Sequence, residues 1–342
     1  MDMPSAIARV MEAGDLDEDE MLAVMRLIMN GHATDAQIGG FLVGLSIKGE
    51  TVDEITAAAT VMRELVTPVE VSPEHLVDTC GTGGSGIAKF NISTASAFVA
   101  TAAGVRVAKH GNRSASGKSG SADVLERAGA DITLGPGEVA RCINSVGVGF
   151  LFAVNHHSAM KHAIRARREM VVRTIFNILG PLTNPAGAKR QLLGVYDARL
   201  VKPLAAVLDK LGSEHVLVVH SDDGLDEISS AAETAVTEVK NGEFKHYKIN
   251  PGDFGVEDGN IESLRVENSD ESFELVKSAL SGKHQGAADI VALNAGAAIY
   301  VSGQAHSLEA GVEMARDAIG SGLALEKMKE FIDFTEQLVN MR

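Results

Sequence analysis

The sequence contains very few of the residues on which several classes of protein depend. Among its 342 residues there is no tryptophan, aromatic residues make up only 4%, and the only cysteines are Cys80 and Cys142. Two cysteines exclude a disulfide-stapled scaffold. The shortage of aromatic rings disfavours a surface on which single-stranded nucleic acid stacks. No apolar run approaches the roughly 18 residues that a membrane-spanning helix needs.

An excess of basic residues is also missing. The chain has 31 Lys plus Arg against 46 Asp plus Glu, which gives a formal net charge of -15. That charge disfavours a dedicated binder of nucleic acid or of anionic membranes, but it leaves room for a small basic pocket. The first residues lack the basic and apolar segments of a secretory signal, so we expect a cytoplasmic protein.

The hydrophobic pattern divides the chain into two regions. Residues 4–68 show helical spacing, and 34–37 and 51–54 fit capping boxes, so four short helices are predicted there. From about residue 71 short apolar runs alternate with helical stretches, which is typical of a mostly parallel sheet covered by helices. We therefore predict an α/β fold with a small all-helical domain, 1–70, and a larger α/β domain, 71–342.

The elements expected in the larger domain follow from the same pattern. An antiparallel hairpin is predicted around Asn241-Gly242, and residues 270–342 are expected to be helical except for one buried strand. Strands are predicted at 75–79, 105–108, 150–153, 192–196, 216–220 and 290–294, the hairpin at 236–239 and 245–249, and helices at 93–103, 120–128, 137–146, 157–168 and 200–211.

A glycine-rich loop follows the first predicted strand. Residues 81–86 read GTGGSG, which matches the G-x-G-x-x-G of dinucleotide-binding folds. Those folds also place an Asp or Glu about 20 residues later to hold the ribose. No acidic residue occurs between Thr79 and Ala122, so the loop favours phosphate binding by main-chain amides over binding of a nicotinamide dinucleotide.

A second loop of similar chemistry follows the next predicted strand. Residues 109–121, KHGNRSASGKSGS, combine glycines, hydroxyls and cations and lead into a helix, whose first amides attract anions. It is not a P-loop, because Gly111 and Gly117 are one residue too far apart. Since parallel strands end at one edge of a sheet, we expect both loops to bind one ligand with several phosphates. The alternative is two flexible surface loops that bind nothing.

Carboxylates gather after the strand predicted at 216–220. They are Asp222, Asp223, Asp226 and Glu227. Mg²⁺ prefers hard oxygen ligands and often bridges to substrate phosphates. A metal would also relieve the repulsion between carboxylates and phosphates, which at 4 Å is about 4 kcal/mol per pair of unit charges at an effective dielectric of 20. We therefore expect a magnesium site here; the alternative is a solvated acidic turn.

Several long motifs together resemble those of the anthranilate phosphoribosyltransferase family. They are GTGGSG at 81–86, NISTAS at 91–96, KHGNRSASGKSGSADVLE at 109–126, HHSAMKHAIRARRE at 156–169, RTIFNILGPLTNPA at 173–186 and DGLDEIS at 223–229. The resemblance implies a nucleoside phosphorylase/phosphoribosyltransferase-like fold, a helical domain completed near 170–190, and a homodimer formed through that domain. It implies transfer of the 5-phosphoribosyl group of phosphoribosyl pyrophosphate to the amine of anthranilate, in tryptophan biosynthesis.

The resemblance also implies roles for individual residues. Two Mg²⁺ ions per subunit would be held by Ser93, Asp226 and Glu227, and association with anthranilate synthase is a further expectation. No protein nucleophile is expected, because the amine of anthranilate is itself a neutral nucleophile. Anthranilate would contact Gly81, His110, Asn112, His157 and Arg167, the last by pairing with its carboxylate. Phosphoribosyl pyrophosphate would contact Gly81, Gly84, Ser85, Lys89, Asn91, Ile92, Ser93, Thr94, Lys109, His110, Gly111, Asn112, Arg113, Ser114, Ala115, Ser116, Gly117 and Ser121.

Two positions depart from the family pattern. Ser85 stands where the family commonly has Asp, and Lys89 stands where it commonly has a small hydroxyl residue. Both changes make the phosphate-binding region more positive. Cys80 abuts the glycine loop without a neighbouring base, so we expect it to be a buried small residue.

Two other functions are compatible with the same fold. A pyrimidine nucleoside phosphorylase would use free phosphate in place of pyrophosphate. A nucleic-acid-binding paralogue would carry degraded motifs. The net charge of -15 and the intact DGLDEIS and KHGNR motifs argue against the paralogue.

Overall fold

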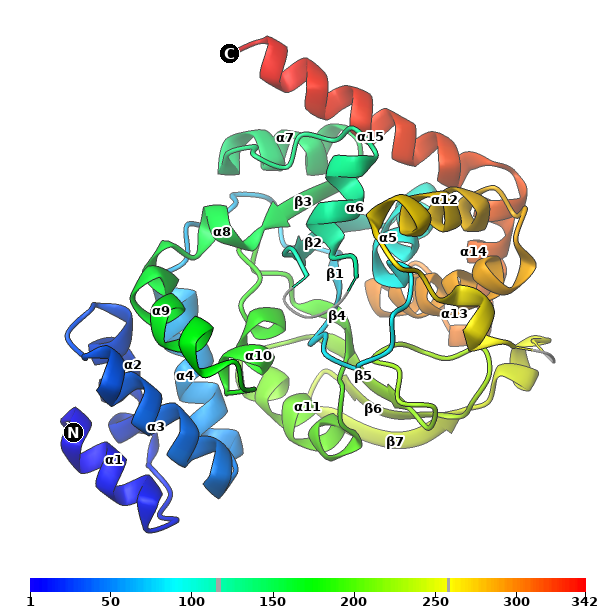
Figure 1. Cartoon of the computed structure of the whole chain (residues 1–342). Helices are drawn as coiled ribbons and strands as arrows, with labels where there is room; N and C mark the ends of the chain where they lie inside the picture. Colours follow the sequence, from blue (N-terminus) through cyan, green and yellow to red (C-terminus); the bar gives the residue numbers. More distant parts are fainter. Residues whose placement is uncertain (115–117, 257–258) are drawn as a thin grey trace.

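The structure is a computed structural model that describes residues 1–114, 118–256 and 259–342. It begins with the four predicted helices, which pack together at one end of the molecule (Figure 1). Three of them start at capping boxes, with Asp17, Thr34 and Thr51 as the capping residues. The helices are α1 (Met3–Met11), α2 (Glu18–Met29), α3 (Asp35–Lys48) and α4 (Val52–Glu64).

The rest of the chain is built on a seven-stranded sheet in the order β3-β2-β1-β4-β5-β6-β7. The first five strands of this order are parallel, and the predicted hairpin adds two antiparallel strands at one edge. Asn241 and Gly242 in its turn both have positive φ, as a tight hairpin requires. The strands are β1 (Leu76–Gly81), β2 (Arg106–Gly111), β3 (Val148–Phe152), β4 (Arg190–Gly194), β5 (His215–Ser221), β6 (Thr234–Lys240) and β7 (Glu243–Ile249).

Helices cover both faces of this sheet (Figure 1). They are α5 (Ile92–Ala102), α6 (Ser121–Arg127), α7 (Pro136–Ser145), α8 (Ala153–His156), α9 (Lys161–Met170), α10 (Phe176–Leu179), α11 (Val201–Lys210), α12 (Ser269–Leu280), α13 (Gln285–Ser302), α14 (Leu308–Gly320) and α15 (Leu323–Asn340). Short 3₁₀ turns lie at Ser158–Met160, Gly180–Leu182, Ala198–Leu200, Pro251–Phe254 and Ile261–Leu264. The α/β fold predicted from the sequence is therefore confirmed.

The strand predicted at 290–294 is wrong. These residues lie inside α13, in which nearly every residue is buried. A helix that is covered all round shows no helical period in its hydrophobicity, so its short apolar run looks like a buried strand. The helix continues to Gly303, whose positive φ ends it.

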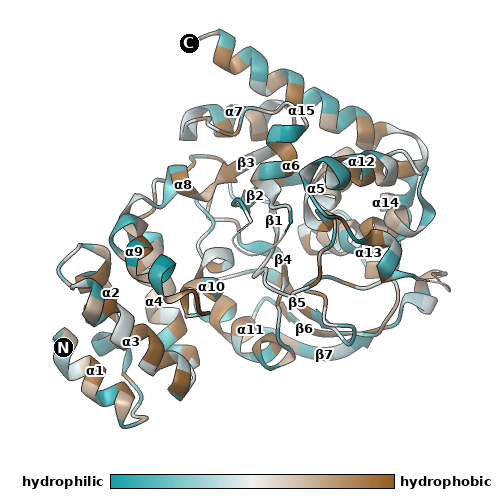
Figure 2. Ribbon diagram, viewed as in Figure 1, coloured by the Kyte–Doolittle hydropathy of each residue, from teal (hydrophilic) through white to brown (hydrophobic). Residues whose placement is uncertain are grey.

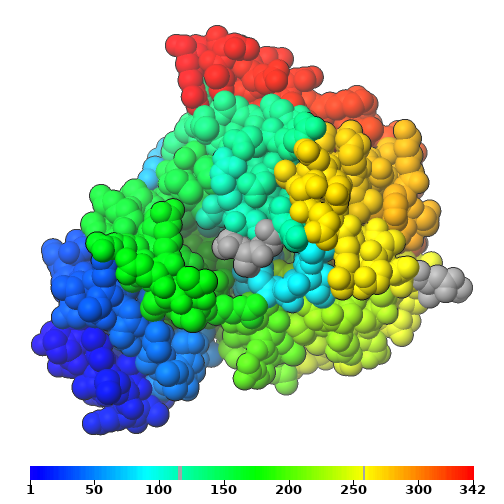
Figure 3. Space-filling model, viewed as in Figure 1, coloured from blue at the N-terminus to red at the C-terminus, as the bar shows by residue number. Residues whose placement is uncertain are grey.

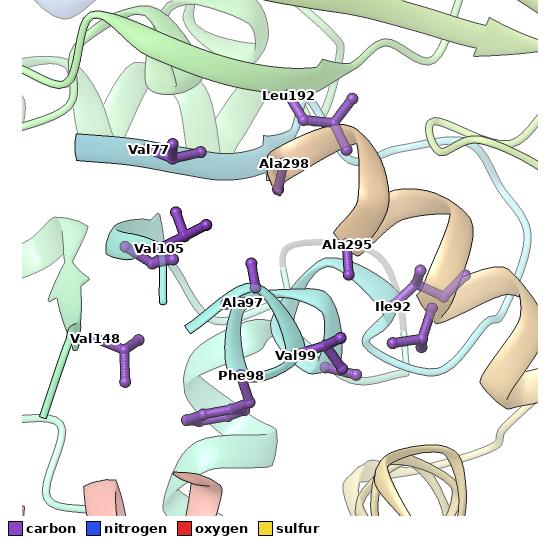
Figure 4. Close-up of a cluster of buried hydrophobic side chains, with 14 of the residues drawn as sticks. Val77, Ile92, Ala97, Phe98, Val99, Val105, Val148, Leu192, Ala295 and Ala298 are labelled. Carbon is purple, nitrogen blue, oxygen red and sulfur yellow. The ribbon is translucent and has the colours of Figure 1, made fainter. Parts of the chain in front are cut away.

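One hydrophobic core lies beneath α5 and α13. Figure 4 shows Ala97 of α5 and Ala295 and Ala298 of α13 pointing into the space between these two helices, with Val77 of β1 and Leu192 of β4 beside them. The small side chains let the two helices approach the sheet closely. The helix α15 packs against this core and is amphipathic, with hydrophobic and polar residues alternating along it in Figure 2.

A second core joins the N-terminal helices to the rest of the chain. Residues of α1 to α4, such as Phe41 and Ile55, share one buried cluster with Ala163 and Ala166 of α9 and Phe176 of α10. The same cluster reaches α11 and the face of β5. No helix in the described parts of the chain is both long and apolar enough to cross a membrane.

Candidate functional site

The strand order reverses beside β1, which creates a natural ligand site. From β1 the chain moves to β2 and then β3 on one side, and it returns to place β4 on the other side. In open α/β sheets, ligands bind outside the carboxyl ends of the strands at such a point. Here those ends are Gly81 and Gly194, which pair with each other. The face of the molecule in Figure 3 is hollowed between the green segment containing α9 and the cyan segment that follows β1.

Asp226 lies directly over these two strand ends. A Cβ atom on Gly194 would stand 1.8 Å from the main-chain oxygen of Asp226, and one on Gly81 would stand 2.6 Å from its Oδ2. Glycine is therefore required at Gly194 for the segment after β5 to approach, whereas at Gly81 a side chain would displace the carboxylate of Asp226. The Oδ2 atom accepts a hydrogen bond of 3.0 Å from the amide of Gly83, so this carboxylate also holds the 81–86 loop.

Lys89 points into the site, toward the carboxylates. Its Nζ lies 2.6 Å from Oδ1 of Asp226 and 3.6 Å from Oε1 of Glu227, and the three side chains are only 14%, 6% and 9% exposed. Burial favours the protonated acid, but the Lys89 ammonium outweighs it and holds the pKa of Asp226 below its ordinary value. Burial raises the pKa of Glu227, because the longer contact with Lys89 offsets it only in part.

This donor set fits a divalent cation. Two adjacent buried carboxylates already hold one positive group, the Lys89 ammonium. Within the described ranges no three His, Cys, Asp or Glu side chains gather into a metal site. The protein would thus supply two carboxylates and a hydroxyl such as Ser93, and water and substrate oxygens would complete the shell, as Mg²⁺ prefers.

The other two acidic residues of the cluster, Asp222 and Asp223, bind neighbouring side chains and stabilise the turn after β5. Asp222 pairs with Lys248 at 3.0 Å. Asp223 accepts hydrogen bonds from the hydroxyls of Ser221 and Ser229. Only the second half of the predicted cluster therefore faces the strand ends.

Lys109 and the start of α5 form the next part of the site. The Nζ of Lys109 donates to the main-chain oxygen of Thr79 at 2.6 Å and to Oγ of Ser93 at 3.1 Å. Burial lowers the pKa of this ammonium. The hydroxyl oxygen of Thr94 is buried and has no partner among the residues that the structure describes, whereas the side chain of Ile92 belongs to the core. Main-chain amides and hydroxyls are thus what α5 offers a ligand.

Asn91 connects the two predicted loops. Its side-chain oxygen accepts hydrogen bonds from the hydroxyls of Ser119 at 2.8 Å and Ser272 at 2.6 Å, and its amide donates to the main-chain oxygen of Ser119. Because the side chain is used in this way, it does not cap α5. The first amides of α5 therefore remain without a side-chain cap.

The second loop keeps some predicted residues at the site and turns others away. Ser121 lies against Gly111, where a Cβ would be 2.2 Å from its hydroxyl. Arg113 instead forms ion pairs with Glu126 at 2.7 Å and Asp123 at 3.1 Å at the surface. The amide of Ser114 donates to Asp123 at 3.1 Å. Ala115, Ser116 and Gly117 lie outside the described residues.

The cation excess of this region is smaller than the sequence suggested. Lys118 pairs with Glu267 at 2.6 Å, and Arg113 and Lys89 are paired as described above. The carboxylates come from later segments of the chain, so the run without acids between residues 79 and 122 does not by itself require a bound anion.

Two histidines meet at the opposite side of the site. The Nε2 atoms of His110 and His157 are 3.2 Å apart, and Nδ1 of His110 lies 3.1 Å from the main-chain oxygen of Gly180. Burial, followed by repulsion between the rings, lowers the pKa of His110 to about 3, and burial lowers that of His157 to about 4. Both rings are therefore neutral at pH 7. Asn112, one residue beyond Gly111, is exposed.

Arg167 on α9 is the available cation on this side. Its guanidinium lies over the ring of Phe176, 5.2 Å from the centroid, and burial lowers its pKa. It has no carboxylate partner among the residues that the structure describes, whereas Arg165 on the same helix pairs with Glu169. A partly buried guanidinium without an acid is suited to binding a carboxylate ligand.

Arg173 and Gly194 were not predicted to belong to the site. Arg173 lies over the ring of Tyr196, 4.3 Å from its centroid, and donates to the main-chain oxygen of Gly84. Arg173 opens the RTIFNILGPLTNPA motif, so the motif could have pointed to it, whereas the role of Gly194 depends on a contact that the sequence does not reveal. Cys80 is partly rather than fully buried, and burial raises the pKa of its thiol well above its ordinary value.

Comparison with known proteins gives a consistent result. Family models match both regions, the "Glycosyl transferase family, helical bundle domain" over residues 4–66 and the "Glycosyl transferase family, a/b domain" over 73–325. The chain is 59% identical over 342 residues to an anthranilate phosphoribosyltransferase of Cellvibrio japonicus, covering 99% of this chain and 100% of the relative.

Solved structures agree. An anthranilate phosphoribosyltransferase of Thermus thermophilus has a TM-score of 0.91 at 42% identity and covers 97% of this chain and 99% of its own. One of Saccharomyces cerevisiae, solved in complex with PRPP and Mg, has a TM-score of 0.87 at 25% identity, with 98% of each chain covered.

Proposed function

We infer that this chain, which belongs to the anthranilate phosphoribosyltransferase family, transfers the 5-phosphoribosyl group of phosphoribosyl pyrophosphate to the amine of anthranilate. The products are N-(5-phosphoribosyl)anthranilate and pyrophosphate, and the reaction belongs to tryptophan biosynthesis. The observation that carries this inference is the position of Asp226 over the ends of β1 and β4, with its carboxylate on the 81–86 loop.

Phosphoribosyl pyrophosphate is proposed to lie between the two glycine loops. Gly84 and Gly86 have positive φ, so their amides can turn toward a phosphate, while the amide of Gly83 holds Asp226. The start of α5 supports the same role, since its first amides have no side-chain cap. The proposed contacts are Gly81, Gly84, Ser85, Lys89, Asn91, the main chain of Ile92, Ser93, Thr94, Lys109, His110, Gly111, Asn112, Ser114, Ser121 and, after rearrangement of its ion pairs, Arg113; Ala115, Ser116 and Gly117 stay predictions.

The enzyme uses magnesium, and we propose two ions per subunit, held by Ser93, Asp226 and Glu227. When bound, magnesium stabilises negative charge on the departing pyrophosphate. The protein contributes the rest: the glycine-loop amides hold the phosphates, and Lys109 keeps the Ser93 hydroxyl in place. Positioning the two substrates in line can contribute several kcal/mol, out of about 7–11 available from proximity.

Anthranilate is proposed to bind beside α9. Arg167 would pair with its carboxylate, since this guanidinium has no acid partner in the described part of the chain. The neutral rings of His110 and His157, with Gly81 and Asn112, would line the path of the acceptor. No side chain is needed to activate the amine, because it is already neutral at pH 7.

We also propose a homodimer formed through the 1–70 domain, which residues near 170–190 complete. The support is an apolar surface on α1 and α3: Met11 is 76% exposed and Ile47 is 82% exposed, and Val43 lies one turn before Ile47. Cys80 and Cys142 are free thiols, in keeping with a cytoplasmic location. Association with anthranilate synthase stays a prediction.

The test is a fluorescence assay. Purified protein is mixed with anthranilate, phosphoribosyl pyrophosphate and Mg²⁺, and the loss of anthranilate fluorescence is followed with an EDTA control. We expect a decay that EDTA abolishes. A folded protein that leaves the fluorescence unchanged, or that splits thymidine with free phosphate, would contradict the proposed reaction.

The anthranilate site is tested by Arg167→Met. Loss of the charge-assisted contact is expected to raise the KM for anthranilate at least about tenfold, since such contacts contribute about 1.5–3 kcal/mol, while the KM for phosphoribosyl pyrophosphate stays unchanged. Arg168→Met, at the exposed neighbouring position, is the matched control. Equal effects of the two variants would remove Arg167 from the site.

A further inference from the structure

Lys89 occupies the place where the proposed function puts a metal. Its ammonium touches Asp226 and approaches Glu227, the two carboxylates proposed as magnesium ligands. The family commonly has a small hydroxyl residue at this position, so a lysine is unexpected here. Resting on the proposed function, we propose that Lys89 competes with the metal for these two carboxylates and gives them up only when the pyrophosphate group of the substrate arrives to pair with the ammonium.

The backbone directs Lys89 into the site. Residues 88–90 pair with a segment that comes from much later in the chain: Phe90 donates to Leu264, Val266 donates to Ala88, and Lys89 forms a bridge with Arg265. Successive side chains of an extended segment point to opposite sides. Because Phe90 is buried in the core, Lys89 must face the other way, toward the carboxylates.

The contact is strong enough to compete with an ion from solution. The 2.6 Å distance from Nζ to Asp226 is that of a charge-assisted hydrogen bond, and the surroundings are nearly closed to water. A metal that binds the free enzyme must therefore displace a paired ammonium, whereas at an exposed acidic turn it would displace only water.

The ammonium can leave without a change of fold. Lysine carries its charge on a flexible four-carbon stem, and the adjoining 81–86 loop, rich in glycines of positive φ, is proposed to hold phosphates. A pyrophosphate group bound there would offer new acceptors to Nζ, and the metal could then take its place on Asp226 and Glu227. Metal and substrate would consequently bind together, each weakly without the other.

Mn²⁺ binding followed by electron paramagnetic resonance tests this without any turnover. In the absence of substrates, Lys89→Thr and Lys89→Met are expected to bind Mn²⁺ at least about tenfold more tightly than the wild type, because the competing charge is gone. Lys89→Arg, which keeps the charge, should bind as weakly as the wild type. Lys118→Thr, which removes a surface ammonium paired with Glu267, should have no effect.

A second titration adds phosphoribosyl pyrophosphate without anthranilate. The wild type is then expected to gain Mn²⁺ affinity by more than about tenfold beyond the gain of Lys89→Thr, since only the wild type has an ammonium to move. Equal Mn²⁺ affinities of wild type and Lys89→Thr, with and without this ligand, would overturn the proposal. Circular dichroism and thermal melting check that each variant is folded. If the uncharged variants do not fold, tight Mn²⁺ binding by Lys89→Arg without substrate would still overturn the proposal, because this variant keeps the competing charge.

The same experiment separates this inference from the proposed function. Asp226→Asn should abolish the tight Mn²⁺ binding of Lys89→Thr, and also the tight binding that the wild type is expected to show with phosphoribosyl pyrophosphate. If Asp226→Asn binds Mn²⁺ as the wild type does, the proposed metal site itself is wrong. If binding depends on Asp226 but not on Lys89, only the competition is wrong.

Discussion

Two buried ionic clusters, one on the sheet and one beyond the ends of its strands, show how a structural site differs from a ligand site. One is the Glu238 cluster, where Glu238 on β6 meets His215 on β5 at 2.9 Å and accepts hydrogen bonds from the hydroxyls of Tyr300 at 2.8 Å and Tyr247 at 3.1 Å. The other is the Lys89 cluster of Lys89, Asp226 and Glu227. Both hold carboxylates away from water.

The difference lies in how well each carboxylate is satisfied. Burial alone would raise the pKa of Glu238, but its partners outweigh burial and lower the pKa to about 2. In the Lys89 cluster the pKa of Asp226 is lowered, while that of Glu227 is raised by burial. A carboxylate with complete partners stabilises the fold, whereas one with a single, distant partner has capacity left for a ligand.

The largest effect is expected when the metal ligands are removed. Asp226→Asn combined with Glu227→Gln should lower Mg²⁺-dependent kcat/KM by more than about 10³-fold, because a bound metal supplies several kcal/mol of charge stabilisation. Steady-state kinetics measure the loss, and circular dichroism should show the fold unchanged. Adding Lys89→Met removes the ammonium that the double variant leaves without a carboxylate. Activity like that of the wild type would refute the metal assignment.

The next largest effect is the reverse, a loss of stability without a loss of activity. Glu238→Gln removes the charge that three side chains satisfy and is expected to lower the free energy of unfolding by about 2 kcal/mol. Its kcat should not change. Urea unfolding measures the free energy of unfolding, and the fluorescence assay measures kcat. A large fall in kcat would contradict a purely structural role for the Glu238 cluster.

The pH dependence of this loss has a definite sign. The folded pKa of Glu238, about 2, lies below the ordinary value of 4.5, so its contribution is fully present above pH 4.5. As the pH falls from 4.5 toward 2 the carboxylate is protonated, and the stabilities of wild type and Glu238→Gln should converge. A constant difference over that range would contradict the assignment.

An effect of comparable size is expected where glycine permits the close approach of Asp226. Gly194→Ala places a methyl group against the main chain of Asp226, so overpacking should cost about 1–3 kcal/mol and lower kcat/KM by a similar free energy. Gly137→Ala on α7 is the matched control, since a Cβ there meets nothing within 4 Å. Chemical denaturation and kinetics compare the two, and equal behaviour would show that the approach is unimportant.

The smallest effect concerns the histidine pair. With pKa values of about 3 and 4, His110 and His157 stay neutral above pH 5. The pH profile of kcat/KM should therefore show no step from these residues between pH 5.5 and 8. A step near pH 6.5 that His157→Gln removes would mean that a charged imidazole takes part.

The sequence predicted the architecture because most elements show a clear period or cap. The capping boxes at Thr34 and Thr51 and the Asn241-Gly242 turn are local signals, and the structure contains them. The prediction for 290–294 was wrong because α13 is buried on nearly all sides there, so its apolar run shows no helical period.

The site was predicted at the level of motifs but not of partners. The sequence marked Asp226 and Glu227, yet it could not show that Lys89 faces them, because that direction depends on pairing with residues 264–266. Nor could it show that Arg113 is neutralised by Glu126 on α6. Contacts between distant segments decide which charges remain available, and a single sequence does not contain them.

The most direct test of the central claim is the position of the metal. A crystal of the protein with Mn²⁺ and phosphoribosyl pyrophosphate would be measured at the manganese absorption edge. An anomalous peak beside the carboxylates of Asp226 and Glu227, with Nζ of Lys89 moved toward a phosphate oxygen, is the predicted result. A manganese peak elsewhere, with Lys89 still bound to Asp226, would contradict the account.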